Sequence, residues 1–315
     1  MDTYTKKIRE IAKDLLASQK VDRVIGFEMG TIPMAARPVS IESENDAEKL
    51  VFNSLCAMNL ANYIRKPKGT IAVIAKGCDS RNMVNHVVEH QVDRENLVII
   101  GVPCHGMIDK SQLALEVEGE ITAYDEEGQT LKITTAQGEL TFEKQDFLKD
   151  NCRLCQHRNP VIHDYMAGDP VTEQELEDPF ADVNEIEAMS QEAKSTLFED
   201  LTKNCIRCYA CRNACPLCFC PTCFVDESSP QWVGKSQNKT DVDTFHFLRA
   251  FHCAGRCTDC GACVEACPMD IDVRKFTRKL IKDSYEMFGW EAGLDISKRP
   301  PLDTFNPADP DDFIM

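Results

Sequence analysis

The sequence predicts an α/β domain with a parallel sheet and a small antiparallel β insertion, followed by a mainly α-helical, cysteine-rich domain. Three observations support this prediction. Short β-branched runs without polar alternation recur in the first 102 residues, which is typical of parallel strands buried on both faces. A polar–apolar alternation broken by turn residues comes next. Most of the 17 cysteines then lie in the last 110 residues.

The elements of the first domain follow from hydrophobic periodicity. An amphipathic helix is predicted over residues 1–20, with apolar positions at Ile8, Ile11, Leu15 and Leu16. Strands are predicted for "VDRVIGF" (21–27), "TIAVIA" (70–75) and "NLVIIGV" (96–102), with helices over 46–65 and 79–91. Repetition of strand, helix and strand implies a parallel sheet with right-handed crossovers.

The domain boundaries follow from changes of composition. Residues 113–146 alternate around the turn formers "DEEG" and "AQG", which predicts an antiparallel meander inserted in a first domain of residues 1–168. The stretch 169–192 is acidic and interrupted by proline, which indicates a linker. We expect the helical domain over 193–290 and an extended, proline-rich tail over 291–315.

Length, charge and cysteine count narrow the class of protein. A chain of 315 residues with 43% hydrophobic content is long enough for two domains with cores of their own. The net charge of −17 without a basic patch disfavours nucleic acid as a partner. No apolar run is long enough to span a membrane, and no secretory signal is visible. We therefore expect a cytoplasmic protein, in which cysteines at this density bind metal; their odd number also disfavours full disulfide pairing.

Two cysteine runs provide the strongest motif. Both match the spacing C-x2-C-x2-C-x3-C-P, in which three cysteines bind one [4Fe–4S] cluster and the fourth crosses to the other cluster of the pair. The spacing predicts one cluster on Cys205, Cys208, Cys211 and Cys267, and a second on Cys257, Cys260, Cys263 and Cys215. Paired zinc knuckles are the alternative, but zinc sites use C-x2-C pairs rather than this four-cysteine run.

The segments around the second run favour helices. "DVDTFHFLRAFHCAGR" (241–256) and "VRKFTRKLIKDSYEMFG" (273–289) both have a helical pattern. This arrangement resembles the α-helical ferredoxin modules in the iron–sulfur subunits of heterodisulfide and fumarate reductases. The second domain is therefore predicted to be a mainly α-helical dicluster ferredoxin domain.

A second constellation lies in the first domain. Cys78 and Cys104 each follow a predicted strand, and parallel strands end at the same edge of a sheet, where α/β proteins bind ligands. The helix that begins beside Cys78 favours its thiolate form. Cys152 and Cys155 follow the meander and can fold back to complete four ligands. The alternative is two ordinary buried thiols and a lone redox or zinc pair.

Residues 20–170 resemble the beta subunits of coenzyme F420-reducing hydrogenases and related formate dehydrogenases. The matching positions are Gly77–Cys78, Gly101 with Cys104, Cys152 with Cys155, and Gly168–Asp169. The resemblance implies a third [4Fe–4S] cluster on Cys78, Cys104, Cys152 and Cys155. It also implies a sheet edge that can bind FAD, which exchanges hydride with a deazaflavin. The family's "GTPCQ" element is "KGCDS" in this chain.

The remaining cysteines and one histidine motif allow other interpretations. Cys56 is predicted to lie in a helix and in the core. A further metal site, cubane or zinc, is a candidate on Cys218, Cys220, Cys223 and Cys253; the alternative is that these four pack as small apolar thiols around the clusters. "HVVEH" (86–90) matches a zinc-protease pattern with both histidines on one helix face. Because no third ligand follows on a later helix, we interpret them as solvated histidines.

The predicted function is an iron–sulfur electron-transfer subunit of a cytoplasmic multi-subunit oxidoreductase, relaying single electrons through three [4Fe–4S] clusters. Its partners would be the other subunits of a formate dehydrogenase-, hydrogenase- or heterodisulfide reductase-type complex, and another subunit would be catalytic. The alternative is an iron–sulfur flavoprotein that transfers hydride between FAD and a deazaflavin or nicotinamide. No G-x-G-x-x-G fingerprint supports nicotinamide binding. A zinc-stabilised interaction protein is a third class.

Overall fold

The computed structural model describes residues 2–301 and 303. The chain divides into two compact units, the first spanning Met1–Leu176 and the second beginning at Glu177. This boundary falls within the stretch that the sequence predicts as a linker. Most of the predicted tail, residues 302 and 304–315, lies outside the described residues. Within the described part of the chain, no helix is both long and apolar enough to cross a membrane.

The first unit is built on a mixed sheet whose central strands are parallel. The strand order is β2-β1-β4-β5-β9, and β3 also pairs with β1. Neighbours β1, β4, β5 and β9 are parallel, whereas β2 and β3 run antiparallel to β1. The predicted parallel sheet is confirmed, with an antiparallel edge in addition. The strands are β1 (Arg23–Met29), β2 (Ala36–Ile41), β3 (Leu50–Val51), β4 (Ile71–Ala75), β5 (Leu97–Gly101) and β9 (Tyr165–Met166).

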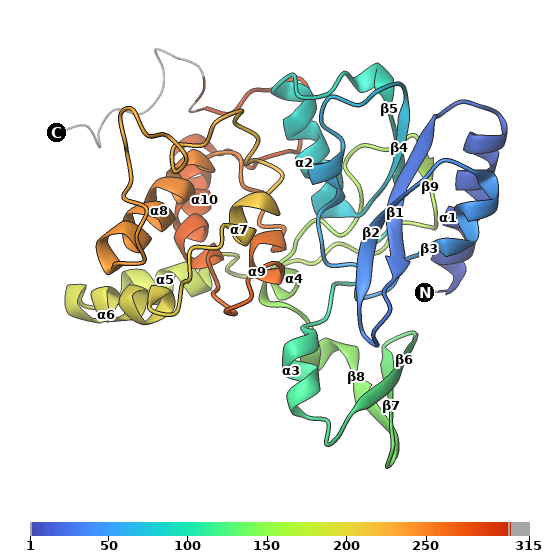
Figure 1. Cartoon of the computed structure of the whole chain (residues 1–315), viewed down its shortest axis with the longest axis horizontal. Coiled ribbons are helices and arrows are strands. Elements are labelled where there is room, and N and C mark those ends of the chain that lie inside the picture. The colour runs from blue at the N-terminus through green and yellow to red at the C-terminus, as the bar shows by residue number, and fades with distance from the viewer. Residues whose placement is uncertain (1, 302, 304–315) are drawn as a thin grey trace. The chain divides into compact units, whose positions relative to one another are not determined.

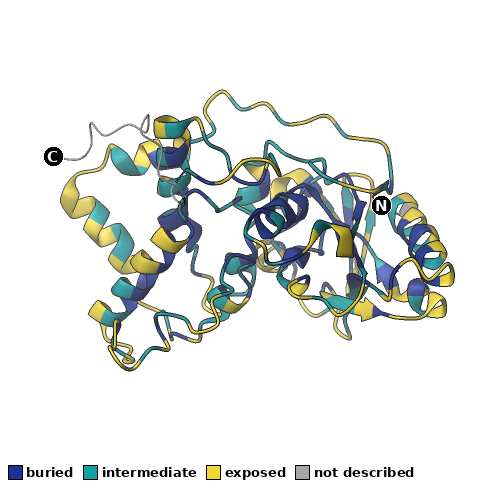
Figure 2. Cartoon of the chain, turned by 90° about the horizontal axis from the view of Figure 1, so that it is seen from above, coloured by how far each residue is buried: buried dark blue, intermediate teal, exposed yellow. Residues whose placement is uncertain are grey.

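Two helices cover opposite faces of this sheet (Figure 1), α1 (Asp2–Ala17) and α2 (Gly77–Val88). The apolar positions that the sequence places on one side of α1 are all buried. Every residue of β4 is buried as well, and the interior strands are dark blue in Figure 2. Burial on both faces explains why β4 and β5 are continuous apolar runs rather than alternating ones.

The prediction of a helix over residues 46–65 is wrong. This segment instead forms the 3-10 turns η1 (Glu44–Lys49) and η2 (Leu60–Tyr63), with β3 and irregular chain between them. The side chains of Asn53 and Asn59 accept hydrogen bonds from the amides two residues later, at 3.0 and 3.1 Å. Asparagine offers the backbone such local partners in place of helix hydrogen bonds. The apolar residues still reach the core, and Cys56 is fully buried as predicted, although outside any helix.

Helix α2 confirms the prediction over 79–91 but not the interpretation of its histidines. The helix ends at Val88, and His90, beyond it, has a left-handed φ of 55°. The two histidines therefore do not share a helix face. His86 has no exposed surface, so the expectation that it is solvated is wrong.

The predicted meander is present as a separate three-stranded antiparallel sheet. It consists of β6 (Ile121–Glu127), β7 (Thr130–Thr135) and β8 (Gly138–Glu143), flanked by α3 (Lys110–Leu115) and the 3-10 turn η4 (Lys144–Phe147). A buried ion pair joins Lys144 to Glu126 at 2.8 Å. The Glu126 carboxylate also accepts hydrogen bonds from the amide and hydroxyl of Ser54, at 2.9 and 2.6 Å. This network fastens the meander to the loop between β3 and η2.

The second unit is helical, as predicted. Its longer helices are α6 (Gln191–Thr202), α8 (Lys239–His252) and α10 (Arg274–Phe288), and its shorter ones are α5 (Ala181–Glu187), α7 (Ala210–Asn213) and α9 (Ala262–Glu265). The Phe276 ring of α10 packs against Phe198 of α6 and Phe247 of α8, with ring centroids 4.9 and 5.1 Å apart. These aromatic contacts hold the three longer helices together beside the cysteine loops.

Candidate metal centres

The two cysteine runs of the second unit fold into the same backbone shape. Arg207 and Asp259, each just before the second cysteine of its run, have φ of 52° and 53°. Tyr209 and Gly261, each just after that cysteine, have φ of 59° and 73°. Each run then enters a four-residue helix, α7 or α9. A left-handed φ is unfavourable for non-glycine residues, so its repetition in both runs indicates loops shaped around a ligand.

All four cysteines of the first predicted set border one small cavity, and most of its other lining residues are apolar. The cavity is lined by Cys205, Cys208, Cys211 and Cys267, with Phe245, Ile271 and Val273 among the apolar residues. Backbone amides point at two of the sulfurs: Arg207 N donates to Cys205 Sγ and Ile271 N to Cys267 Sγ, both at 3.4 Å. Four soft sulfur donors with amides directed at them suit an iron–sulfur cluster.

Burial favours the protonated form of two of these thiols, Cys205 and Cys211, in the absence of metal. Burial raises the pKa of Cys211 to about 12, although the positive charge of Arg249 opposes the shift. Burial also raises the pKa of Cys205. Because the metal ligand is the thiolate, metal binding here would release protons.

The second predicted set gathers around Cys215. Burial is the main reason that the pKa of Cys260 is raised, and the charge of Cys215 is the next. Burial is also the main reason that the pKa of Cys263 is raised; the charge of Arg249 opposes the shift and that of Cys215 adds to it. Burial, then Asp259, raises the pKa of Cys257 to about 12, and Cys215 contributes again. The charge of the fourth cysteine of the first run therefore acts on the first three of the second run, which is consistent with the crossed ligand pattern.

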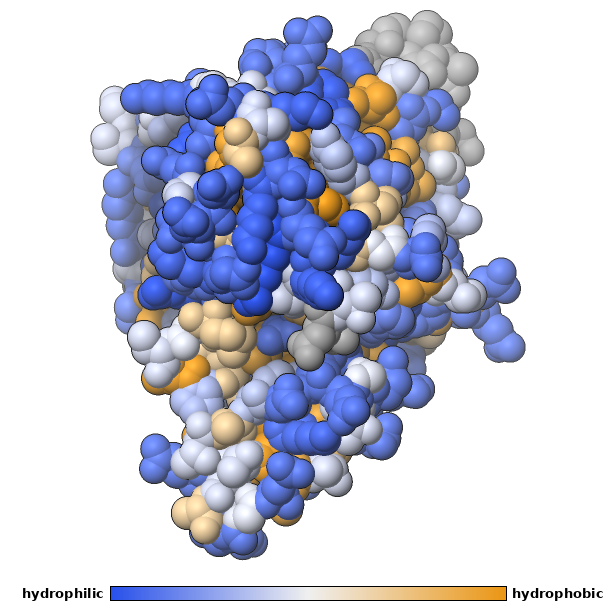
Figure 3. All heavy atoms as spheres, turned by 90° about the vertical axis from the view of Figure 1, so that its right-hand side faces the viewer, coloured by the Kyte–Doolittle hydropathy of each residue, from blue (hydrophilic) through white to orange (hydrophobic). Residues whose placement is uncertain are grey.

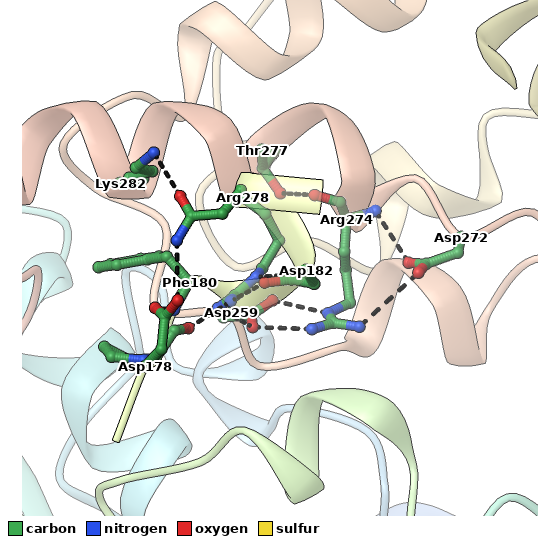
Figure 4. A network of polar contacts seen from close by, with 11 residues as sticks. Asp178, Phe180, Asp182, Asp259, Asp272, Arg274, Thr277, Arg278 and Lys282 are labelled. Carbon is green, nitrogen blue, oxygen red and sulfur yellow. Dashed lines mark hydrogen bonds and ion pairs between the residues drawn. The ribbon is translucent and has the colours of Figure 1, made fainter. Parts of the chain in front are cut away.

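A buried salt-bridge network holds the loop of the second run (Figure 4). Arg274 makes two hydrogen bonds to the carboxylate of Asp259, at 2.6 and 2.8 Å. Arg278, one turn later on α10, bonds the same carboxylate at 3.2 Å and also Asp182 of α5 at 2.9 Å. Paired arginine–carboxylate bonds of this kind are strong and directional. They hold Asp259 in its left-handed conformation between Cys257 and Cys260.

Helix α8 presents a polar face to the cysteines, and the sequence patterns did not predict this face. His246 Nε2 lies 3.3 Å from Cys205 Sγ, and its ring stacks on Phe276 with centroids 5.5 Å apart. Burial, then the nearby charge of Arg249, lowers the pKa of His246 to about 4. The available signal was polar residues at helical spacing: His246, Arg249 and Cys253 occupy positions i, i+3 and i+7 of a helix whose other side is aromatic.

The candidate extra site is only partly assembled. The sulfurs of Cys218 and Cys253 lie with that of Cys215, all within 4.8 Å of one another. Cys220 is exposed, and Cys223 is half-buried; neither sulfur belongs to this trio. A tetrahedral ion with bonds of about 2.3 Å separates its sulfurs by about 3.8 Å, so this trio has the spacing of ligands to a single iron or zinc ion. Among the described residues, no other group of three potential ligands is this close.

The four cysteines of the first unit lie near one edge of the sheet. Cys78 lies in the first turn of α2, directly after β4, and Cys104 follows β5. Since β4 and β5 are parallel neighbours with Ala75 beside Gly101, both thiols lie at their carboxyl ends. Burial raises the pKa of Cys155 to about 12, and the charges of Cys104 and Cys152 add to the shift. The fold-back of the C-x2-C pair toward this edge thus brings its sulfurs beside Cys104.

Close backbone contacts hold the C-x2-C loop in this position. A Cβ on Gly77 would lie 2.0 Å from the carbonyl oxygen of His157, so only glycine permits this approach. The amide of Cys104 donates to the carbonyl of Arg158 at 2.9 Å. Met107 N donates to Cys152 Sγ at 3.2 Å, an amide-to-sulfur contact like those in the second unit.

A buried ion pair underlies this edge. Lys76 and Asp79, both almost without exposed surface, are joined at 2.9 Å. Burial alone would lower the pKa of Lys76, but the carboxylate of Asp79 and the sulfurs of Cys78 and Cys104 raise it. Lys76 is therefore a fixed positive charge next to the cysteines, in the "KGCDS" segment where the chain differs from the resembling family.

A cleft of the first unit lies away from these cysteines. A cleft of about 780 Å³ is lined by α1 residues such as Arg9, by Phe52 and by Tyr124 of the meander. Its described lining contains no cysteine. Figure 3 shows this side of the first unit, where hydrophilic side chains dominate the surface.

The fold and the cysteine sites together define an iron–sulfur protein. Residues 201–271 match the 4Fe-4S dicluster domain family. The match spans both cysteine runs and confirms the dicluster ferredoxin domain that their spacing predicts.

The chain as a whole is similar to beta subunits of formate dehydrogenases. The F420-dependent formate dehydrogenase subunit beta of Methanocaldococcus jannaschii is 24% identical over 358 residues, covering 94% of this chain and 93% of that one. The F420-dependent formate dehydrogenase 1 subunit beta of Methanococcus maripaludis is 25% identical over 362 residues, covering 94% and 92%. These relatives confirm the predicted resemblance to this group of beta subunits.

A solved structure of the F420-reducing [NiFe] hydrogenase complex from Methanosarcina barkeri also aligns. It covers 50% of this chain and 59% of that one, with 13% identity and a TM-score of 0.37. A likeness at this level carries no structural argument.

Proposed function

We propose that the chain is an iron–sulfur electron-transfer subunit of a multi-subunit oxidoreductase complex. The observation that carries the proposal is the pair of cysteine loops with matching left-handed positions, within a region that matches the 4Fe-4S dicluster domain. The similarity to formate dehydrogenase beta subunits along 94% of the chain supports a role beside a separate catalytic subunit. The proposed complex is of the formate dehydrogenase, hydrogenase or heterodisulfide reductase type.

Three [4Fe–4S] clusters are the proposed cofactors. The first would be held by Cys205, Cys208, Cys211 and Cys267, the second by Cys257, Cys260, Cys263 and Cys215, and the third by Cys78, Cys104, Cys152 and Cys155. A bound cluster supplies one-electron transfer. The chain's own groups supply the thiolates, the amides that donate to sulfur, and apolar walls that exclude water; these are the features that tune a cluster.

A second function is favoured by the relatives, which are F420-dependent formate dehydrogenase subunits by name. In that case the chain would be an iron–sulfur flavoprotein that transfers hydride between FAD and a deazaflavin. FAD would bind at the carboxyl edge of the first unit's sheet, the general ligand position of α/β folds. Flavin content separates the two functions: about one FAD per chain would favour the enzyme, and its absence the electron-transfer subunit.

The test is anaerobic affinity purification, with co-purifying subunits identified and iron, sulfide, zinc and flavin counted on one sample. We expect brown protein with about twelve irons per chain, from three four-iron clusters, together with a larger catalytic subunit. The Cys211→Ser and Cys263→Ser variants should each lose iron, whereas Cys220→Ser, at an exposed cysteine, should not. A colourless protein that holds zinc, or no metal after anaerobic reconstitution, would refute the proposal.

A further inference from the structure

Arg249 is a buried cation without a carboxylate partner. It lies on the inner face of α8 with 4% of its surface exposed. Its Nη2 donates one hydrogen bond, to the carbonyl of Cys211 at 3.1 Å, and its Nε is buried without a partner. In the described part of the chain, no aspartate or glutamate forms an ion pair with it.

Other buried arginines of the same unit show how such a charge is normally compensated. Arg274 and Arg278 are each about as buried as Arg249, and both bond directly to aspartates. Burying a guanidinium without an anion is costly, and arginine cannot lose its proton to avoid the cost. The surroundings of Arg249 must therefore supply negative charge of another kind.

The titratable groups that act most strongly on Arg249 are cysteine sulfurs, and they come from both predicted cluster sets. They are Cys211 of the first set, Cys215 and Cys263 of the second, and the neighbouring Cys253. As ordinary thiols these groups would be neutral, and Arg249 would remain uncompensated. As thiolates of two metal clusters they would carry the missing negative charge.

We propose that Arg249 is the shared counter-charge of the two clusters of the second unit and raises the reduction potential of both. The inference rests on the proposed function, because it requires both clusters to be present. Reduction adds one electron to a cluster without adding a proton, so the reduced state is more negative. A fixed positive charge favours that state, and removing the charge makes each cluster harder to reduce.

The expected size of the effect follows from Coulomb's law. Two unit charges about 10 Å apart at an effective dielectric constant of about 20 interact by more than the energy of a tenfold change in equilibrium. We therefore expect the equilibrium constant for one-electron reduction to fall at least tenfold when the charge is lost, which is 59 mV per cluster.

The experiment is an EPR-monitored redox titration of the anaerobically purified full chain carrying Arg249→Met, Arg249→Gln or Arg249→Lys, with iron counted on each sample. The control is Arg212→Met. Arg212 is next to Cys211 in sequence, but its charge is already paired with Asp226 at 2.8 Å. We expect both neutral variants to lower both potentials, Arg249→Lys to stay close to wild type, and the control to shift far less.

Two outcomes would overturn the inference. One is a neutral variant that holds the wild-type amount of iron at unchanged potentials; the other is Arg249→Lys behaving like the neutral variants, which would assign the effect to hydrogen bonding or packing. If both neutral variants lose iron while Arg249→Lys keeps its iron at wild-type potentials, the positive charge is needed to hold the clusters, which supports its role as their counter-charge. A wild-type chain without iron would instead refute the proposed function itself.

Discussion

Substitution of Lys76 by methionine tests whether the ion pair beneath the first unit's cysteines is structurally essential. Lys76 Nζ donates to Asp79 Oδ2 at 2.9 Å and to the carbonyl of Met58 at 2.8 Å. Methionine has a similar length but removes both bonds. The Asp79 carboxylate would keep two backbone donors, the amides of Leu60 and of residue 76, each at 3.1 Å. It would lose the cation that opposes the burial-driven rise of its pKa, so ionised Asp79 would be uncompensated.

The expected loss of stability is large. Breaking a buried ion pair from one side costs about 3–5 kcal/mol. In a unit of this size each kcal/mol corresponds to about 2–4 °C in Tm, so a fall of about 6–20 °C is expected. The double variant Lys76→Met/Asp79→Leu should recover most of this loss, because it removes both buried charges together.

The assay is a urea titration of the full chain, read by hydrogen exchange of peptides from β4 and β5, because a two-unit chain need not unfold in one step. Lys132→Met is the matched control. Its pair with Glu127 is exposed, and such pairs contribute about 0–1 kcal/mol. A loss of less than about 1 kcal/mol for Lys76→Met would contradict this prediction. So would a double variant that is no more stable than the single one.

Three further predictions concern the metal centres and the meander. Cys215→Ala should retain most of its iron, because the sulfurs of Cys218 and Cys253 lie within 4.8 Å of this position and can replace the lost ligand. Cys260→Ala should instead lose about four irons per chain. Equal iron losses in the two variants would contradict this prediction. Gly77→Ala should lose the iron of the first unit and keep that of the second, because its Cβ would collide with the carbonyl of His157. EPR signals of the individual clusters would measure this. An unchanged signal from the first unit would contradict the prediction. Burial would raise the pKa of Glu126, but the bonded Lys144 lowers it below the usual 4.5. The ion pair therefore contributes its whole stabilisation above pH 4.5, and this contribution is lost as the pH falls through the lower pKa of the folded state. The urea midpoint of wild type should fall with pH for this reason, whereas that of Glu126→Gln should not. If the two variants show the same dependence of the midpoint on pH, the prediction is wrong.

Local sequence patterns predicted the elements correctly where the environment of a segment dictates its hydrophobic pattern. Strands β1, β4 and β5 were predicted because burial on both faces demands continuous apolar runs, and the meander because one exposed face demands alternation. The segment 46–65 was mispredicted because its apolar spacing suits a helix, while Asn53 and Asn59 form local hydrogen bonds that end one. The short β9 pairs with β5 over only two residues, too few to leave a pattern.

The cysteine spacing determined by itself that this chain carries a dicluster iron–sulfur domain, because the covalent geometry of a cubane limits which thiolates of a short loop can reach it. Only the tertiary structure identified the charges around those cysteines. Arg249 and Lys76 look like surface residues in the sequence, since a charged side chain gives no local sign of being buried. Burial depends on how α8 and β4 pack against distant segments, and that packing is what turns an ordinary cation into a compensating charge beside the sulfurs.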